Sequence, residues 1–360
     1  MAEKKVTDIQ AAIEEQGYRW QASTTSVSEL SVAEQKAHLG LAVSKEELDA
    51  MEAAIQAAES AMALQAAIAA PAAIDWRNKA GDWTTPIKDQ QNCGSCVSFA
   101  VCATLESRIN IACRNANLDP DLSEAHLFFC GCGNCCGTGW NFAPALNFAK
   151  NTGVGRETSF PYTPSNQACQ SISPDIKIDL WTAVIPVADR KNILATKGPM
   201  VAGMAVYADF FTYRSGVYRA TSTNLRGYHA VSVVGYDDQE ECWICKNSWG
   251  TGWGENGWFK IGYGESGIDT QFAFYDVDLK CPSPGPLDLC RRYQPYLTSV
   301  IHAARVNRRL RGCLLYYVCG VRLTPRPLCG QAMLRVVRRV RYVLMRCPQY
   351  RKAFCRALMR

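Results

Sequence analysis

The stretch KDQQNCGSCVSFA, residues 88–100, places two cysteines three positions apart at the start of an apolar helical pattern. Cys93 and Cys96 are compatible with a redox pair, with half of a zinc site, or with one structural thiol beside one reactive thiol, and their spacing alone leaves all three open. Apolar residues recur at helical spacing to about residue 113, which predicts a helix that begins at Cys96 and that Ser95 can cap. Because a helix N-terminus favours an anion, we expect the Cys96 thiol to be acidic and nucleophilic.

The composition is that of an ordinary globular protein. The 360 residues are 48% hydrophobic and 20% charged, which is enough for two packed units. The charge is uneven, because residues 281–360 hold sixteen Arg, one Lys and one Asp, a net charge of +16. The whole chain carries +6, so residues 1–280 carry −10. This asymmetry predicts a domain boundary near residue 280.

Two features bear on the cellular compartment and point in different directions. The 18 cysteines favour disulfide bonds and therefore an oxidising compartment or export. The opening residues MAEKKVTDIQ lack the apolar region of a secretory signal, and no apolar run has the length of a membrane span. The second observation favours the cytoplasm by default, and the location stays open.

The order of the expected elements indicates an α+β fold. Residues 8–16 and 45–69 are rich in Ala, Glu and Gln and predict helices, and Ser31 and Glu34 between them form a capping box. After residue 72 the sequence becomes rich in Trp, Gly and turn residues. Helices come first and strands later, which is α+β order rather than βαβ repetition. The elements expected there are helices at 96–113, from Ser123 and at 143–150, and strands at 201–207, 228–236, 242–249 and 257–264.

The residues that could serve a reactive Cys96 stand far downstream. A thiolate used for acyl transfer needs a base that accepts its proton and later protonates the leaving amine, and histidine suits this role near neutral pH. Of the four histidines, His229 stands in GYHAVSVVGYDD, 133 residues after Cys96. Asn247 lies 151 residues after Cys96 in KNSWGTGWG, and Trp249 follows it.

Over about residues 75–279 the sequence resembles the papain family of cysteine peptidases, through the motifs TPIKDQ, CGSC, LSEAHLFFC, FPYT, YRSGVY, HAVSVVGY and CKNSWGTGWGENGWFKI. The resemblance implies that Cys96 is the nucleophile, His229 the base and general acid, and Asn247 the residue that orients the imidazole. It also implies that Trp249 shields the hydrogen bond between Asn247 and His229 from water. No metal or other cofactor is expected.

The resemblance extends to the oxyanion hole and the substrate pocket. Gln90 matches the family's oxyanion-hole glutamine, and its side-chain N–H would act beside the backbone N–H of Cys96. The aromatic residue that usually follows the nucleophile is Val97 here, a change that removes no catalytic group. The usual Gly-Gly of the pocket wall is replaced by CCGTGW, so the S2 pocket is expected to accept bulky apolar side chains. The residues expected to shape this pocket are Trp140, Gly203, Gly227 and Ala230.

The resemblance implies two disulfide bonds. Cys93 is expected to pair with Cys136, with Cys135 as the competing partner, and Cys130 is expected to pair with Cys169. A zinc site made from the cysteines of residues 130–136 is the weaker alternative, because adjacent cysteines rarely both face one metal.

The remaining cysteines of the body have plainer expected roles. Cys242 and Cys245 form a second C-x-x-C, but they fall in an expected strand, where neighbouring positions alternate faces and a bridge would distort the ladder. We expect two buried free thiols there. Cys102 and Cys113 are expected to fill the core of the first helix.

The resemblance implies a two-subdomain fold with the active-site cleft between a helical subdomain that carries Cys96 and an antiparallel, β-barrel-like subdomain that carries His229. Residues 1–72 are expected to form a helical inhibitory pro-region that crosses the cleft, and residues 73–279 the peptidase domain. The expected function is that of a cysteine endopeptidase made as a zymogen that cleaves proteins or peptides. The alternatives are a thiol acyltransferase or amidase with the same triad, and a non-catalytic polyanion-binding protein.

Residues 280–360 form an Arg- and Cys-rich tail of unknown role. The segment MLRVVRRVRYVLMR predicts an amphipathic basic helix. Its Arg335, Arg338, Arg339 and Arg346 are expected near one face. We favour intramolecular docking of the tail on the acidic body, with nucleic acid or an anionic membrane surface as alternatives. The oligomeric state is not predicted.

Overall fold

The computed structural model of the chain describes residues 5–62, 70–282, 286–321, 327, 329, 331–346 and 348–359. The protein divides into two compact units, unit 1 (residues 1–281) and unit 2 (residues 282–360). The described apolar residues form two core clusters in unit 1 and a separate cluster in unit 2.

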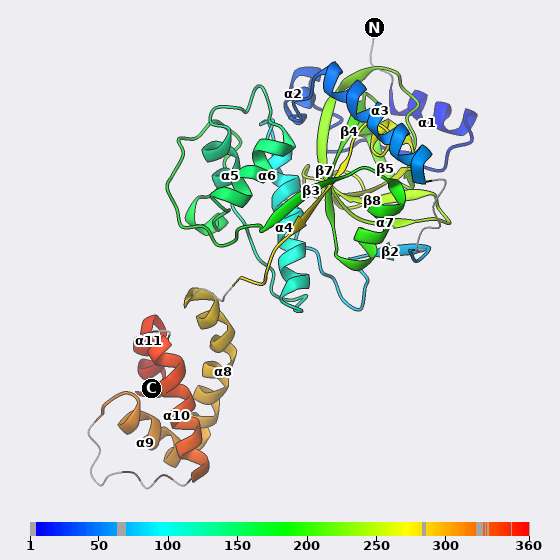
Figure 1. Cartoon of the computed structure of the whole chain (residues 1–360). Coiled ribbons are helices and arrows are strands. Elements are labelled where there is room, and N and C mark those ends of the chain that lie inside the picture. Colours follow the sequence, from blue (N-terminus) through cyan, green and yellow to red (C-terminus); the bar gives the residue numbers. More distant parts are fainter. Residues whose placement is uncertain are drawn as a thin grey trace. The chain divides into compact units, whose positions relative to one another are not determined.

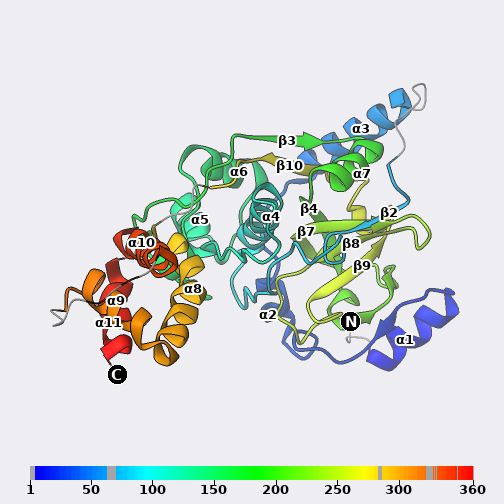
Figure 2. The same ribbon diagram turned by 90° about the horizontal axis from the view of Figure 1, so that it is seen from below.

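The helical half of unit 1 is organised around α4 (Cys96–Ala112). The helices α5 (Glu124–Gly131) and α6 (Phe142–Asn151) pack on one side of α4, and strands of the sheet pack on the other (Figure 1). Figure 2 shows the same sandwiched position of α4 from below. Since α4 is buried along almost its whole length, Cys96 is held by a rigid element rather than by a loop.

The second half of unit 1 is β-rich. Its eight-stranded sheet has the order β3-β10-β4-β7-β8-β9-β6, with β2 paired to β7, and β6–β9 is the parallel pair among the described ones. The long strand β7 is hydrogen-bonded to β4 and β8, which fixes its residues from both sides. The strands are β2 (Ala73–Asp75), β3 (Leu180–Val184), β4 (Met200–Tyr207), β6 (Val217–Tyr218), β7 (Leu225–Asp237), β8 (Cys242–Lys246), β9 (Trp258–Gly262) and β10 (Phe274–Asp278).

Helical turns and an aromatic cluster complete the β-rich half. The helix α7 (Val187–Thr196) contacts β3 and β7. The rings of Phe210, Trp249 and Trp253 pack edge to face or tilted in a buried cluster, with centroids within 5.7 Å of one another. The short 3-10 helices are η1 (Glu157–Ser159), η2 (Phe210–Thr212) and η3 (Glu265–Gly267).

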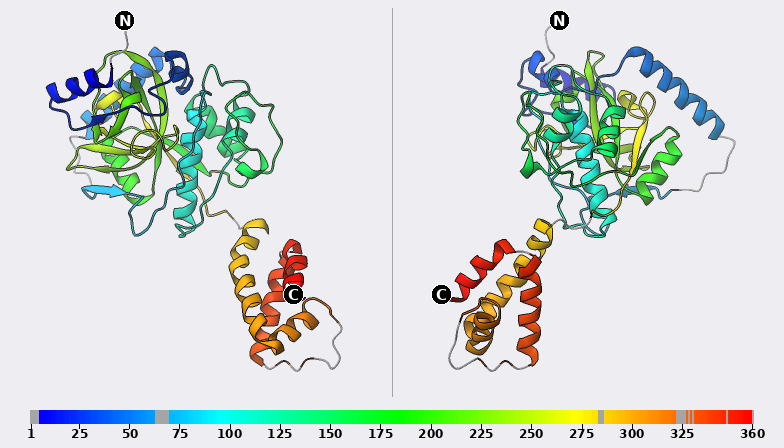
Figure 3. Two further views of the ribbon diagram at one scale, coloured as in Figure 1. Left: turned by 180° about the vertical axis from the view of Figure 1, so that it is seen from behind. Right: turned by 60° about the vertical axis from the view of Figure 1, so that its left-hand side comes forward.

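The N-terminal segment belongs to unit 1 and packs on the β-rich half (Figure 3). It contains α1 (Val6–Glu15), β1 (Gln21–Ala22), α2 (Val32–Ala37) and α3 (Lys45–Met62). The strand β1 pairs with β5 (Tyr213–Ser215), and Ile9, Ile13 and Trp20 are buried in the core of the β-rich half. Ser31 and Glu34 form the capping box at the start of α2.

Most predicted helices and strands are present, but the expected roles of two residues, Ser95 and Cys113, are wrong. Ser95 is the residue before α4, but its side chain makes no capping bond and instead lies 2.8 Å from the Tyr162 hydroxyl. Cys113 is not a free core residue, because it forms a disulfide bond with Cys281. The helix expected at 45–69 is described as α3, and residues 63–69 lie outside the described residues.

Unit 2 is helical in its described part. Its core is formed by apolar residues of all four helices and by disulfide bonds Cys313–Cys329 and Cys319–Cys355. The helices are α8 (Pro286–Val306), α9 (Arg308–Tyr317), α10 (Gln331–Arg346) and α11 (Pro348–Met359). None of the helices described in either unit combines the length and the apolar character needed to cross a membrane.

Candidate active site

Cys96 lies at the first position of α4, behind a loop that is fixed by a disulfide bond. Cys93 is bonded to Cys136, and the Gly94 N–H donates to the Cys136 carbonyl at 2.8 Å. Cys96 itself is a free, fully buried thiol. Of the two cysteines in the C-x-x-C, only Cys96 is therefore available for chemistry.

His229 and Asn247 form a buried pair on neighbouring strands. His229 lies on β7, and Asn247 directly follows β8. His229 Nε2 lies 2.8 Å from Asn247 Oδ1, and because this amide oxygen can only accept, Nε2 carries the proton. Asn247 Oδ1 also accepts the Ser248 N–H at 2.8 Å, and the Trp249 ring lies 4.8 Å from the His229 ring. This arrangement leaves Nδ1 as the basic nitrogen of His229.

The thiol and the imidazole come from different halves of unit 1 but lie close together. The backbone N–H of Ala230, next to His229 in β7, hydrogen-bonds to the sulfur of Cys96. His229 Nδ1 is buried and has no hydrogen-bond partner among the described atoms. The arrangement can pass a proton from Cys96 to Nδ1 while Nε2 remains on Asn247.

Gln90 is held rigidly beside the loop that leads to Cys96. Its backbone N–H donates to the Ser248 carbonyl at 2.9 Å, and its side-chain oxygen accepts from the Ser248 hydroxyl at 2.6 Å. The side-chain Nε2 therefore points away from Ser248, and it donates to the carbonyls of Cys93 and His38 at 2.9 and 3.1 Å. The glutamine thus offers a fixed donor, and a carbonyl of the N-terminal segment occupies it.

Residues 38–42 of the N-terminal segment cross directly over these groups. The Gly40 N–H hydrogen-bonds to the Cys96 sulfur, and the His38 backbone also interacts with the His229 imidazole. Gly40 approaches so closely that a Cβ there would lie 1.9 Å from the carbonyl oxygen of Gly94. Any side chain at position 40 would lift the segment away from the nucleophile.

The same segment is tied to the walls of the site by its backbone. The Gly40 carbonyl accepts the Trp140 N–H at 2.8 Å, and the Ala42 N–H donates to the Trp140 carbonyl at 2.9 Å. The Leu41 N–H donates to the Tyr228 carbonyl at 3.2 Å. Residues 40–42 are thus held as a short strand between the two halves of unit 1.

The four residues expected to shape the substrate pocket do not all play the same part. Gly203 lies beneath Leu41, since a Cβ on it would come within 2.8 Å of the leucine side chain. A Cβ on Gly227 would meet Leu39 at 3.2 Å, and Trp140 contributes its backbone to the segment. Ala230 acts through its N–H on Cys96.

Phe272 is a pocket residue that the sequence reasoning missed. A Cβ on Gly203 would lie 2.5 Å from the Phe272 ring, and Phe272 lines the same apolar cavity as Leu41, a cavity of about 650 Å³. Its position in "TQFAFYD" resembles that of any core aromatic. Only the packing of the chain reveals its place.

Burial under the N-terminal segment changes the titration of Cys96 and His229. Burial raises the pKa of the Cys96 thiol to about 11, although the N–H groups of Ala230, Gly40 and Val97 act in the opposite direction. Burial lowers the pKa of His229 to about 4. The expectation of an acidic thiol is wrong for this covered state, because desolvation outweighs the helix N-terminus. At neutral pH both groups are uncharged here.

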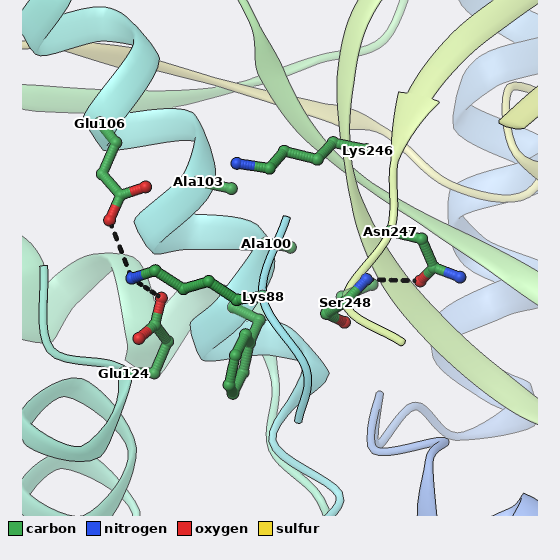
Figure 4. A pocket seen from close by; sticks show the side chains of 10 residues that line it. Lys88, Ala100, Ala103, Glu106, Glu124, Lys246, Asn247 and Ser248 are labelled. Carbon is green, nitrogen blue, oxygen red and sulfur yellow. Dashed lines mark hydrogen bonds and ion pairs between the residues drawn. The ribbon is translucent and has the colours of Figure 1, made fainter. Parts of the chain in front are cut away.

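A buried charge cluster lies behind the site, between α4 and the strand that leads to Asn247 (Figure 4). Lys88 Nζ lies 2.8 Å from Glu124 and 3.1 Å from Glu106, while Lys246 Nζ donates to the Thr85 carbonyl at 2.7 Å. Burial alone would lower the pKa of Lys88, but the two carboxylates raise it, and burial raises the pKa of Glu124 to about 8. The cluster ties the segment before Gln90 to α4 and α5.

The other cysteine clusters form bonds or remain buried. Cys130 is bonded to Cys169, and Cys132 to Cys135, so these cysteines are disulfides rather than metal ligands. The residues that the structure describes contain no group of His, Cys, Asp or Glu suited to a metal ion. The thiols of the C-x-x-C at residues 242–245 and of Cys102 are free and buried.

Residues 70–275 match the family described as papain family cysteine protease. The chain belongs to this family. Over 213 aligned residues the chain is 36% identical to cysteine proteinase 1 of Entamoeba histolytica, and the alignment covers 54% of the chain and 64% of the relative. They are 34% identical over 203 residues to a cathepsin L-like proteinase of Fasciola hepatica, covering 54% and 60%. The chain thus spans less than two thirds of the length of these curated relatives.

Solved structures of family precursors have the same fold. The procathepsin B S9 of Trypanosoma congolense has a TM-score of 0.63 at 22% identity, covering 77% of this chain and 99% of that one. The digestive procathepsin L2 of Tenebrio molitor has a TM-score of 0.60 at 24% identity, covering 75% and 87%. The α+β papain-like fold with an N-terminal helical pro-region is therefore the fold of this chain.

Proposed function

We propose that the protein is a cysteine endopeptidase of papain type that is made as a zymogen. The observation that carries the proposal is the meeting of three parts: a free thiol at the start of α4, an imidazole with its Nε2 on Asn247, and the side-chain N–H of Gln90. Each has a role in acyl transfer through a thioester.

In the proposed mechanism Cys96 transfers its proton to His229 Nδ1 and its sulfur attacks the carbonyl carbon of the scissile peptide bond. The carbonyl oxygen becomes an oxyanion that accepts hydrogen bonds from Gln90 Nε2 and the Cys96 N–H. His229 then protonates the leaving amine, and the thioester remains on Cys96. Water, deprotonated by His229, attacks the thioester and releases the acid product.

Residues 1–72 act in this proposal as the inhibitory pro-region, and residues 73–279 as the peptidase domain. The carbonyl of His38 takes the donor that an oxyanion would need, and Gly40 covers the nucleophile. Removal of the segment would return solvent to Cys96 and His229, which reverses the burial that shifts both pKa values. The charged thiolate and imidazolium pair would then form.

We further propose that the S2 pocket accepts a bulky apolar side chain. Leu41 supports this, because it is buried against Gly203 and Phe272 in a predominantly apolar cavity. A substrate side chain of leucine size would replace it once the pro-region has left.

The test is product analysis with the processed protein and a dipeptide amide that carries a fluorogenic amine. The endopeptidase proposal expects release of the free acid, blocked by a thiol-directed epoxide. An acyltransferase would instead give mainly the transferred amide when a second amine is supplied. A non-catalytic polyanion-binding protein would release no fluorophore, and either of these outcomes would replace the proposal.

For residues 280–360 we propose an anionic partner, supported by the net charge of +16 on residues 281–360. The acidic body of the same chain, nucleic acid and an anionic membrane surface all offer such charge. Docking on the body would have the advantage of high effective concentration and would weaken with salt. Sedimentation of the intact chain at low and high salt tests whether the unit is docked.

A further inference from the structure

The helix α10 of unit 2 has two distinct faces. The face that packs into the core of unit 2 consists of Val337, Val340, Val343 and Leu344. At 3.6 residues per turn, a second set of five positions falls on the opposite side of the helix, and all five side chains are exposed. This set, here called the outer face of α10, consists of Arg335, Arg338, Arg341, Tyr342 and Met345.

The outer face mixes guanidinium groups with large apolar side chains. Tyr342 is 44% exposed and Met345 is 72% exposed. Six large apolar side chains are exposed among the described residues. Unit 2, which is about a fifth of the chain, contains four of them: Val306, Tyr342, Met345 and Met359. Two of them, Tyr342 and Met345, share the outer face of α10, and large apolar side chains exposed together on one face are typical of a surface that another body covers.

The arginines of the outer face differ from those that stabilise unit 2 itself. Arg339 stacks over the Tyr296 ring at 4.8 Å, and Arg311 and Arg351 donate to backbone carbonyls of the unit. Residues 282–360 contain one acid, Asp288, so the outer face cannot be neutralised from within the unit. Its counter-charges come from solvent ions or from a partner rich in anions.

The chemistry of the outer face selects among anionic partners. Nucleic acid and an acidic protein surface would satisfy the arginines, but neither needs an exposed methionine beside them. The headgroup layer of a bilayer offers phosphates to arginine and, directly below, an apolar boundary that accepts tyrosine and methionine side chains. The presence of both kinds of side chain on one helix face fits the bilayer.

We propose that the outer face of α10 binds the surface of an anionic lipid bilayer. Arg335, Arg338 and Arg341 contact the lipid phosphates, and Tyr342 and Met345 lie at the boundary between headgroups and acyl chains. This inference deepens the anionic partner proposed above and is independent of the peptidase activity.

The test measures sedimentation of the full chain, carrying Cys96→Ala, with vesicles of phosphatidylcholine alone or with 30% phosphatidylserine. Binding is expected only to the anionic vesicles. Arg335→Ala, Arg338→Ala and Arg341→Ala together should lower the partition coefficient roughly 100-fold, since each basic side chain near such a surface contributes about 1 kcal/mol. The matched control removes the same charge elsewhere in unit 2, through Arg305→Ala, Arg308→Ala and Arg309→Ala. The loss of partition coefficient in this control should be at least tenfold smaller than the loss caused by the outer-face triple.

A second variant separates lipid from other anions. Tyr342→Ser with Met345→Ser should weaken vesicle binding severalfold at both low and high salt, and should leave binding to a short DNA duplex unchanged. Equal losses for the two arginine triples, or no effect of the Tyr342 and Met345 changes, would overturn the proposal in favour of a polyanion bound by charge alone. Absence of vesicle binding by the parent chain would also overturn it. Because all these side chains are exposed, thermal unfolding of each variant checks that unit 2 stays folded.

Discussion

Leu41 offers the sharpest test of the proposal that the pro-region holds the peptidase latent. It is only 6% exposed, its N–H is fixed to the Tyr228 carbonyl, and its side chain packs over Gly203 beside Phe272. Replacing a buried leucine with alanine costs about 2–5 kcal/mol, and the lower part of that range applies where water can refill the space. Leu41→Ala should therefore weaken the covered state by about 2–3 kcal/mol, or roughly 30- to 150-fold in its equilibrium with the open state.

The assay is the initial rate of dipeptide amide hydrolysis by the full-length chain at neutral pH, with gel analysis to confirm that it is uncut. The initial rate of the uncut Leu41→Ala chain should exceed that of the uncut parent chain by the same factor, roughly 30- to 150-fold. The Leu41→Met chain, in which the side-chain volume is preserved, should stay latent. Leu180→Ala is the matched control, because Leu180 is 48% exposed and lies on the edge strand β3. If uncut Leu41→Ala stays as latent as the parent while folding normally, the leucine does not hold the pro-region in place.

Three further predictions concern the oxyanion donor, the disulfide and acid activation. Gln90→Ala should lower kcat of the processed enzyme about 10²- to 10³-fold with little change in KM, and an unchanged kcat would remove Gln90 from the oxyanion hole. Loss of the Cys93–Cys136 disulfide, which closes a loop with a sequence separation of 43, should lower the free energy of unfolding by about 4 kcal/mol in a denaturant titration. His38 has a pKa held below its ordinary 6.5, chiefly by burial, so the covered state is fully stable above pH 6.5 and weakens as pH falls below it. His38→Gln should make the rate of processing less dependent on pH between 4 and 6.5, and an unaltered pH profile would exclude this histidine.

The sequence predicted the parts of the site that have local or motif signals. The apolar stripe from Cys96 predicted α4, and the strand patterns around His229 and Asn247 predicted β7 and β8, so the expected catalytic residues could be named before their geometry was known. The capping box of Ser31 and Glu34 was also visible, because it depends on residues three positions apart.

What the sequence could not give depends on contacts between distant segments. The pKa of Cys96 was predicted in the wrong direction, because the helix N-terminus is a local feature and the burial comes from residues about 56 positions earlier. Cys113 and its disulfide partner Cys281 stand 168 residues apart in the sequence. The carbonyl of His38 on Gln90 has no sequence signature at all, since every residue carries a carbonyl.

The charge cluster illustrates the same limit in another way. No prediction from the sequence concerned Lys88, Glu106 and Glu124, and the structure buries the two carboxylates almost fully. Only the folding of α4 and α5 against the segment before Gln90 brings them together.

The most direct test of the central claim is an active-site titration of the processed protein with a thiol-directed epoxide, followed by peptide mapping. The account predicts that hydrolysis of the dipeptide amide falls linearly to zero as one equivalent of epoxide is bound, that the label is on Cys96, and that Cys96→Ala has neither label nor activity. Hydrolysis that persists in the Cys96→Ala protein, or a label on another cysteine that accompanies inactivation, would contradict it.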